Sequence, residues 1–174
     1  MSGALDPLPI ATLRDGQEVR IRADETIRSA IAKRLRLPAV HAFEADATLS
    51  VAGDVIVAKG VVKASVDQAC TATGEPVPER VEEEVTLRFA PQPQHEEEEE
   101  IELGEGDLDT IFHDGRTIEL GDALVDTLAL ALDPYPRRAD ADARLKAAGV
   151  LTEEEAGAFG VLADLKKRME KGGD

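Results

Sequence analysis

The sequence predicts an α+β domain in which an antiparallel sheet, either an open β-meander or a partly closed barrel, is covered by α-helices and carries an acidic disordered loop. Three stretches between residues 43 and 89 alternate apolar and polar side chains, as half-buried strands do, and short turns separate them. One segment before them and one after them repeat apolar residues at helical spacing. Because 174 residues with 43% hydrophobic side chains suffice for one sizeable core, we expect a single domain over residues 1–174.

The first helix is predicted over residues 24–37. Asp24 is a suitable N-cap, and Pro38 follows at a position where the helix cannot continue. The inner face is formed by apolar residues at helical spacing, namely Ile27, Ala30, Ile31 and Leu35. The outer face carries basic residues, namely Arg28, Lys33, Arg34 and Arg36. Two interpretations of these cations stay open: an ordinary solvated helix face, or a docking surface for an acidic partner.

Three strands are predicted next, over residues 43–51, 55–66 and 79–89, and the first two are joined as a hairpin. Their inward-facing residues are Phe43, Ala45, Ala47, Leu49 and Val51, then Ile56, Ala58, Val62, Ala64 and Val66, then Val81, Val85, Leu87 and Phe89. Glu83 falls on the inward face of the third strand. We therefore expect this carboxylate near an edge or rim of the sheet.

Residues 91–110 are predicted to be a flexible acidic loop inserted in the domain. The stretch is rich in proline and glutamate, so it cannot bury enough apolar surface to offset the entropy of ordering it. A divalent-cation site is the alternative, but the carboxylates are not spaced around a tight glycine turn as in an EF-hand loop. We predict no bound metal here and expect Glu96, Glu97 and Glu98 to contact a partner.

The net charge of −16 is concentrated in residues 75–126, which contain 18 acidic residues and three basic ones. Affinity for nucleic acids comes mainly from cations that neutralise phosphates, so this part of the chain should repel RNA. Basic partners are therefore favoured over naked nucleic acid.

A second helix is predicted over residues 119–132, with Leu120, Leu124, Leu128 and Ala131 on its apolar face. It should stop at Asp133, because the residue before a proline is pushed out of the helical region. In the Pro-Tyr-Pro turn that follows, Tyr135 and the nearby Arg137 are candidates for partner recognition, and a purely structural helix stop is the alternative. Residues 138–174 are predicted to be a C-terminal helical segment.

Cys70 is the only cysteine, so the chain has no internal disulfide and no closed zinc site of its own. Catalysis by this thiol would need a nearby base, and nothing in the spacing of His41, His95 and His113 brings one to it. A buried packing residue is the favoured interpretation. Phosphate-binding glycine motifs are absent as well, and we predict neither an enzyme nor a cofactor.

The N-terminal residues lack the basic start and apolar run of a secretion signal, and no apolar segment approaches the roughly 20 residues that span a bilayer. We expect a soluble cytoplasmic protein that contacts no membrane.

Three stretches together resemble one family: QACTATGEPVPERVEEEVTLRF, TIELGDALVDTLALALDPYPR and the C-terminal GAFGVLADLKKR. The combination is similar to the YceD family, the large ribosomal RNA subunit accumulation proteins, in the form found in alphaproteobacteria. The resemblance extends from about residue 20 to the end of the chain. The positions that carry the family motif are Cys70, Gly74, Glu75, Pro76, Asp133, Pro134 and Pro136.

The resemblance implies a bacterial factor needed for accumulation of large-subunit ribosomal RNA, through synthesis, processing or assembly, without catalytic activity. Many relatives have a Cys-x-x-Cys pair where this chain has Cys70 and Thr73, so a zinc or redox role does not transfer. Combined with the negative charge of residues 75–126, the resemblance suggests that a basic ribosomal protein or assembly factor is the partner and that RNA contact is indirect. The alternative is a direct RNA-binding protein that uses the basic helix face and the tail cations Lys166, Lys167 and Arg168.

Overall fold

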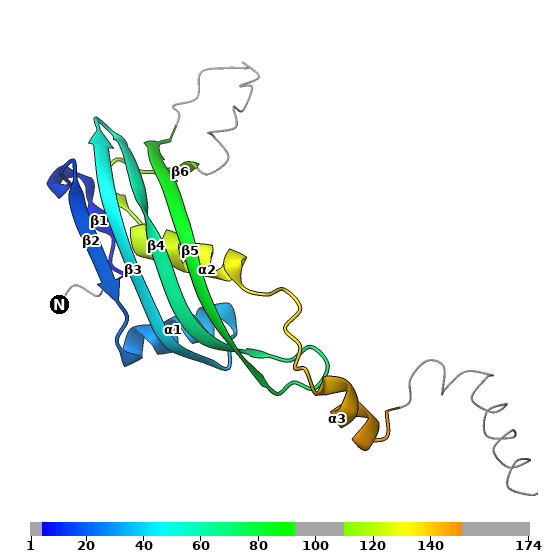
Figure 1. Ribbon diagram of the computed structural model, residues 1–174. Helices are drawn as coiled ribbons and strands as arrows, with labels where there is room; N and C mark the ends of the chain where they lie inside the picture. Colours follow the sequence, from blue (N-terminus) through cyan, green and yellow to red (C-terminus); the bar gives the residue numbers. More distant parts are fainter. Residues whose placement is uncertain (1–4, 93–109, 151–174) are drawn as a thin grey trace, which may run out of the picture. The chain divides into compact units, whose positions relative to one another are not determined.

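The computed structural model describes residues 5–92 and 110–150 (Figure 1). The elements are β1 (Leu8–Pro9), a 3-10 turn (Ile10–Thr12), β2 (Gln17–Arg22), α1 (Glu25–Leu35), β3 (Ala39–Ala52), β4 (Val55–Ala69), β5 (Pro76–Pro91), β6 (Thr110–His113), β7 (Thr117–Ile118), α2 (Leu120–Ala131) and α3 (Ala141–Ala147). They fall into two compact units. The first contains residues up to Gln68 and Pro78–Pro134, and the second contains Ala69–Val77 and the residues from Tyr135 onward.

The first unit is built on a five-stranded sheet with the order β2-β3-β4-β5-β6, and a small antiparallel pair of β1 and β7 accompanies it. The α+β prediction is confirmed, and the meander is the correct alternative, because the sheet is open and not closed into a barrel. β6 differs from the expected antiparallel arrangement, since it pairs in parallel with β5. Parallel neighbours need a crossover of a dozen or more residues, and the acidic segment between β5 and β6 supplies that length.

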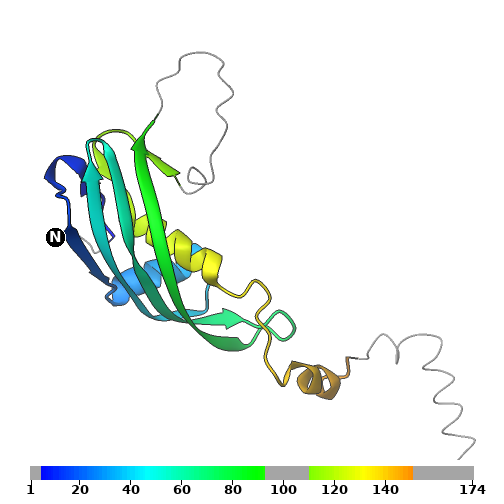
Figure 2. The ribbon, with the colours of Figure 1, turned by 45° about the horizontal axis from the view of Figure 1, so that its top comes forward.

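Both helices of the first unit lie on the same face of the sheet (Figures 1 and 2). The predicted inward residues form the core there: Phe43, Leu49, Ile56, Val62, Val66 and Phe89 of the sheet pack with Ile31 of α1 and with Leu120, Leu124 and Leu128 of α2. The alternation in β3 and β4 is as predicted. Burial of this apolar surface is the main force that holds the helices on the sheet.

α1 begins after Asp24 as the sequence predicts, and it ends at Leu35, two residues before the predicted limit. The Oδ1 atom of Asp24 accepts the amide hydrogen of Ile27 at 2.9 Å, and Arg36 ends the helix in a left-handed conformation with φ of 56°. The prediction for Ala30 is wrong, because this residue is exposed, whereas Ala32 packs against the core. The two alanines lie roughly 100° on either side of Ile31, and the covered face extends toward Ala32.

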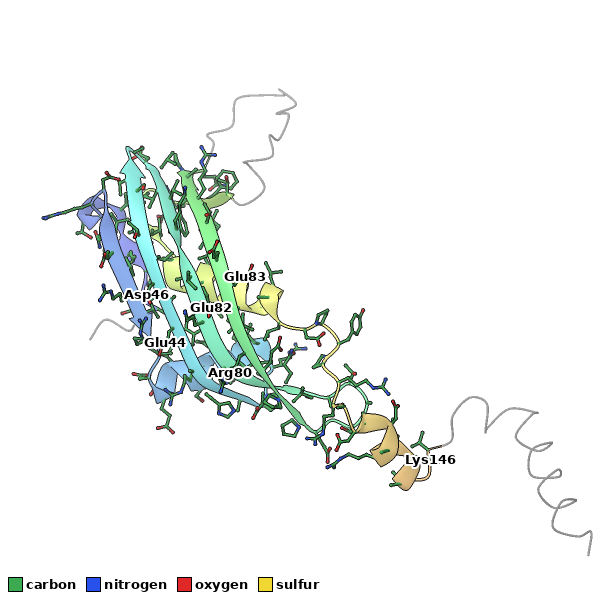
Figure 3. All side chains as sticks on the ribbon, in the orientation of Figure 1. Glu44, Asp46, Arg80, Glu82, Glu83 and Lys146 are labelled. Carbon is green, nitrogen blue, oxygen red and sulfur yellow. The ribbon has the colours of Figure 1, made fainter. Side chains whose placement is uncertain are left out.

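The outer face of the sheet is solvated and carries charged side chains, among them Glu44, Asp46 and Glu82 (Figure 3), and ion pairs connect neighbouring strands there. Arg22 contacts Asp46 at 2.9 Å and Glu44 at 3.3 Å, and Lys63 contacts Glu82 at 2.7 Å. Exposed pairs of this kind each contribute at most about 1 kcal/mol, so they keep the face soluble more than they hold the fold. Among the helices of the described ranges, none has the length and apolar character required to cross a membrane.

Candidate functional site

Most of the motif residues meet in the second unit, which we call the motif unit (residues 69–77 and 135–150). Its first segment is the loop between β4 and β5. The amide of Gly74 donates to the Cys70 carbonyl and the amide of Cys70 donates to the Glu75 carbonyl, both at 2.8 Å. Gly74 has a φ of +73°, a conformation that favours glycine. These two bonds give the loop a fixed shape.

The second segment of the motif unit is bound to this loop through Pro136. Its carbonyl accepts the amide of Thr71 at 2.8 Å and the Thr71 hydroxyl at 3.2 Å. The proline is buried, as is Ala141 at the start of α3. The Pro-Tyr-Pro turn therefore ends α2 and also binds the loop between β4 and β5 through the Pro136 carbonyl.

Four charged side chains complete the motif unit. The guanidinium of Arg138 binds both carboxylate oxygens of Asp140, at 2.8 and 3.2 Å, and the Nε of Arg144 donates to Asp140 at 2.8 Å. Hydrogen bonds from Arg138 and Arg144 hold the pKa of Asp140 well below its usual range. Glu75 joins the network through an ion pair with Arg144 and a 3.6 Å contact with Arg138. The network links the loop to α3 across a large sequence separation.

Cys70 is buried, as predicted, with 3% of its surface exposed. The Arg138 amide approaches its sulfur at 3.5 Å. The Thr73 hydroxyl and this amide both donate to the sulfur, and they lower the Cys70 pKa from 9.0 to about 7. Thr73 stands where the second cysteine of a Cys-x-x-Cys pair would be, and here it supplies a hydrogen bond in place of a thiol.

Replacing Thr73 with valine is expected to raise the Cys70 pKa from about 7 toward 9.0, because the strongest donor to the thiolate is lost. Thiolate absorbance near 240 nm, titrated from about pH 5 to about pH 10, measures this directly because the chain has one cysteine. Since the folded wild type favours the thiolate, its stability should also rise between pH 7 and 9, and less so in the variant.

Thr71→Val is the matched control, because the Thr71 hydroxyl donates to Pro136 and not to the sulfur. It should leave the titration midpoint unchanged. An unchanged midpoint in Thr73→Val would contradict the assigned hydrogen bond.

Asp133, another motif residue, is held within the first unit. Its amide donates to Glu79 at 3.1 Å, and its carbonyl accepts from the buried Gln68 at 3.0 Å. Gln68 also donates to the other carboxylate oxygen of Glu79. These hydrogen bonds hold the chain in place where α2 ends, so the Asp133-Pro134 sequence has a structural role. Nearby in sequence, Tyr135 is 78% exposed and Arg137 forms an ion pair with Asp142.

The basic face of α1 is partly engaged inside the molecule. Arg34 binds Asp122 at 2.6 Å and Asp126 at 2.7 Å, so it joins α1 to α2. Arg28 donates to the Ala23 carbonyl at 3.0 Å. Lys33 and Arg36 are exposed, and in the described part of the chain neither has an ion-pair partner. Sequence reasoning missed the helix-joining role of Arg34, although two aspartates four residues apart on the outer face of α2 were a usable signal.

Some of the residues singled out in the sequence lie in parts of the chain that the structure does not describe, and others are engaged in local hydrogen bonds. Glu96, Glu97, Glu98, His95 and the tail cations lie outside the described residues. His41 lies 3.0 Å from Asp67, and the buried His113 hydrogen-bonds the Asp54 carbonyl at 2.8 Å. Across residues 5–92 and 110–150, no three side chains of the metal-binding types are grouped so that they could hold an ion.

A family model described as large ribosomal RNA subunit accumulation protein YceD matches residues 58–166, more than half of the chain. The match begins within β4, later than the resemblance read from the sequence, and it includes both segments of the motif unit. No curated protein and no solved structure matches the chain significantly.

Proposed function

Because the chain belongs to the YceD family, whose name ties its members to accumulation of large-subunit ribosomal RNA, we propose that it acts as a non-enzymatic factor that binds a basic protein partner. The partner is a ribosomal protein or an assembly factor of the large subunit. RNA levels respond to this contact indirectly.

The single observation that carries the proposal is the distribution of charge. Residues 75–126 contain 18 acidic and three basic residues, a field that repels phosphate and attracts cations. Proteins that bind ribosomal RNA neutralise its phosphates with lysine and arginine, so they are basic before they reach the RNA. An acidic factor of this kind binds them in place of the RNA and can deliver or hold them during assembly.

The internal pairing of the α1 cations supports a protein partner over direct RNA binding. Arg34 is occupied by two aspartates and Arg28 by a backbone carbonyl, which leaves Lys33 and Arg36 as the exposed cations of that face. Two exposed cations form only a small basic surface. Phosphate binding of useful strength at physiological salt requires several more uncompensated contacts.

Affinity capture of the tagged protein from its own cell lysate, with and without ribonuclease and at low and high salt, tests this proposal. We expect basic large-subunit proteins to be retained after ribonuclease treatment and lost at high salt, because screening weakens exposed charge contacts. Mass spectrometry identifies the proteins, and RNA sequencing follows any precursor RNA.

The matched control in this experiment changes three consecutive glutamates elsewhere in the chain. Glu96→Gln, Glu97→Gln and Glu98→Gln together should reduce the capture, whereas the same change at Glu153, Glu154 and Glu155 should not. Capture that disappears with ribonuclease would favour direct RNA contact instead, and its loss in Lys33→Glu with Arg36→Glu would locate that contact on α1.

A further inference from the structure

Within residues 5–92 and 110–150, one edge of the long strand β5 is only partly paired. β4 is its neighbour on one side, and on the other side β6 pairs only with Arg88–Pro91. Along residues 78–87, the described part of the chain places no strand against that second side. Unpaired amide and carbonyl groups on such an edge are a template for another extended chain.

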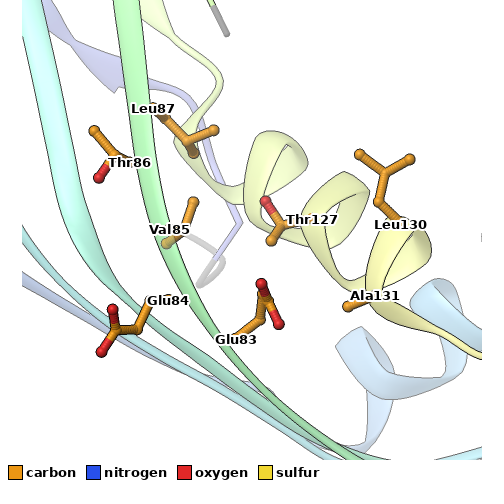
Figure 4. Close-up of a pocket in the computed structure, with 8 residues that line it drawn as sticks. All are labelled: Glu83, Glu84, Val85, Thr86, Leu87, Thr127, Leu130 and Ala131. Atoms are coloured by element: carbon orange, nitrogen blue, oxygen red, sulfur yellow. The ribbon is translucent and has the colours of Figure 1, made fainter.

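α2 forms a second wall beside this edge, and the space between them is a groove of about 310 Å³ (Figure 4). We call it the β5 groove, and it is lined by Glu83, Glu84, Val85, Thr86 and Leu87 of β5 and by Thr127, Leu130 and Ala131 of α2. Consecutive β5 residues line it, although successive side chains of a strand point to opposite faces. This is expected only if the groove runs along the backbone edge.

The lining of the β5 groove is acidic and partly apolar. Glu83 and Glu84 are exposed, and among the described residues neither has an ion-pair partner. The nearby Glu82, in contrast, is paired with Lys63. No lysine or arginine lines the groove, and Leu130 is 89% exposed at its α2 wall. An occupant that matches this surface is extended, carries cations and has apolar side chains at alternate positions.

We propose that the β5 groove binds an extended basic segment of a protein partner by strand addition to β5. Backbone hydrogen bonds to the unpaired edge supply the attachment. The alternation of the added strand places its cations on the outer side of the sheet, where Glu84 lies, and its apolar side chains on the side that faces α2 and Leu130 (Figure 4). The inference rests on the proposed function, because it specifies where and in what form the basic partner binds.

Charge disfavours two other occupants. A second copy of the chain that added its own β5 in the register centred on Glu83 would oppose glutamate to glutamate, which destabilises a strand pair. The acidic segment between β5 and β6 has the same sign of charge as the groove. The basic residues 164–171 of the chain itself are the remaining alternative, and the experiment includes them.

The test uses the full chain and a fluorescent peptide of sequence Lys-Val-Lys-Val-Lys-Val-Lys, with binding followed by anisotropy at low salt. A peptide of the same sequence with alternate backbone nitrogens methylated keeps its charge but cannot form the strand ladder on that side. We expect at least roughly tenfold weaker binding of the methylated peptide. Amide chemical shifts in nitrogen-15 spectra should move along residues 82–87.

Two charge variants separate the groove from the general acidity of the chain. Glu83→Gln with Glu84→Gln should weaken binding of the peptide roughly fivefold, because it removes the exposed charge pair at Glu84 and the neighbouring negative charge of Glu83. Glu18→Gln with Glu44→Gln removes the same charge from β2 and β3 and should leave the binding unchanged.

Equal binding of the two peptides would overturn strand addition, since the contact would then be purely electrostatic. A peptide that copies residues 164–171 and binds more tightly than the Lys-Val peptide would replace the partner with the chain's own tail. The proposed function fails separately. If basic proteins are still captured from lysate while the groove variants have no effect on peptide binding, the β5 groove is not the binding site, but the proposed basic partner is retained. A capture that contains no basic protein contradicts the proposed function itself.

Discussion

Replacing Phe89 with alanine is expected to lower the free energy of unfolding by about 4 kcal/mol, in the range of large-to-small changes at fully buried aromatic residues. Phe89 is 0% exposed and belongs to the core that β5 shares with α1 and α2. Its removal leaves a cavity among the large side chains that surround it in the core. Urea unfolding followed by far-ultraviolet circular dichroism measures the loss.

Phe112→Ala is the matched control, because Phe112 lies on β6 and is 58% exposed. Its removal should change the unfolding free energy by no more than about 0.5 kcal/mol. Similar losses for the two variants would contradict the assignment of Phe89 to the core and of β6 to the sheet margin.

Gly60→Ala is expected to destabilise the first unit by about 3 kcal/mol, at the upper end for overpacking in a folded interior. A Cβ atom at Gly60 would lie 2.0 Å from the carbonyl oxygen of Asp46 and 2.7 Å from the Cα of Ala47. Both atoms belong to the backbone of β3, so neither can turn aside as a side chain would. The same urea titration measures the effect.

Gly53→Ala provides the comparison. A Cβ atom there meets nothing within 4 Å, and the only strain is the positive φ of 62°. Its expected cost is about 1 kcal/mol, the usual penalty of the left-handed region for a residue with a side chain. If Gly60→Ala cost no more than this variant, the close approach of β3 and β4 at that point would be wrong.

The local patterns of the sequence were sufficient to predict the central part of the fold. Strict alternation located β3 and β4, because one face of each is buried and the other is solvated. The capping residue Asp24 and the proline after Asp133 gave the limits of the two main helices. Glu83 is exposed on the inward-facing register of β5, as its position near a free edge requires.

β2 was missed although its alternation is visible, with Ile21 buried and its polar neighbours exposed. β2 is short and has only two apolar residues, so its alternation of apolar and polar residues is less distinct than in the longer strands. β6 gave no local signal. Its parallel pairing depends on a long connection from β5, and residues that pair across such a distance leave no pattern in the intervening sequence.

The motif unit could be predicted in its members but not in its geometry. The resemblance identified Cys70, Glu75 and Pro136, yet their association depends on hydrogen bonds between residues more than sixty positions apart. The charge network showed that Arg138 and Arg144, which the motif did not include, hold it together. Side chains that act across such separations are recognised only when the fold brings them together.

The ratio of large-subunit to small-subunit ribosomal RNA in cells shows whether the acidic residues act in ribosomal RNA accumulation. It should be measured in strains whose only copy of the protein carries Glu96→Gln, Glu97→Gln and Glu98→Gln, or the same change at Glu153, Glu154 and Glu155. The first variant should lower the ratio toward that of a deletion strain, and the second should not. A normal ratio in the first variant, at normal protein level, would contradict a role for Glu96, Glu97 and Glu98 in ribosomal RNA accumulation.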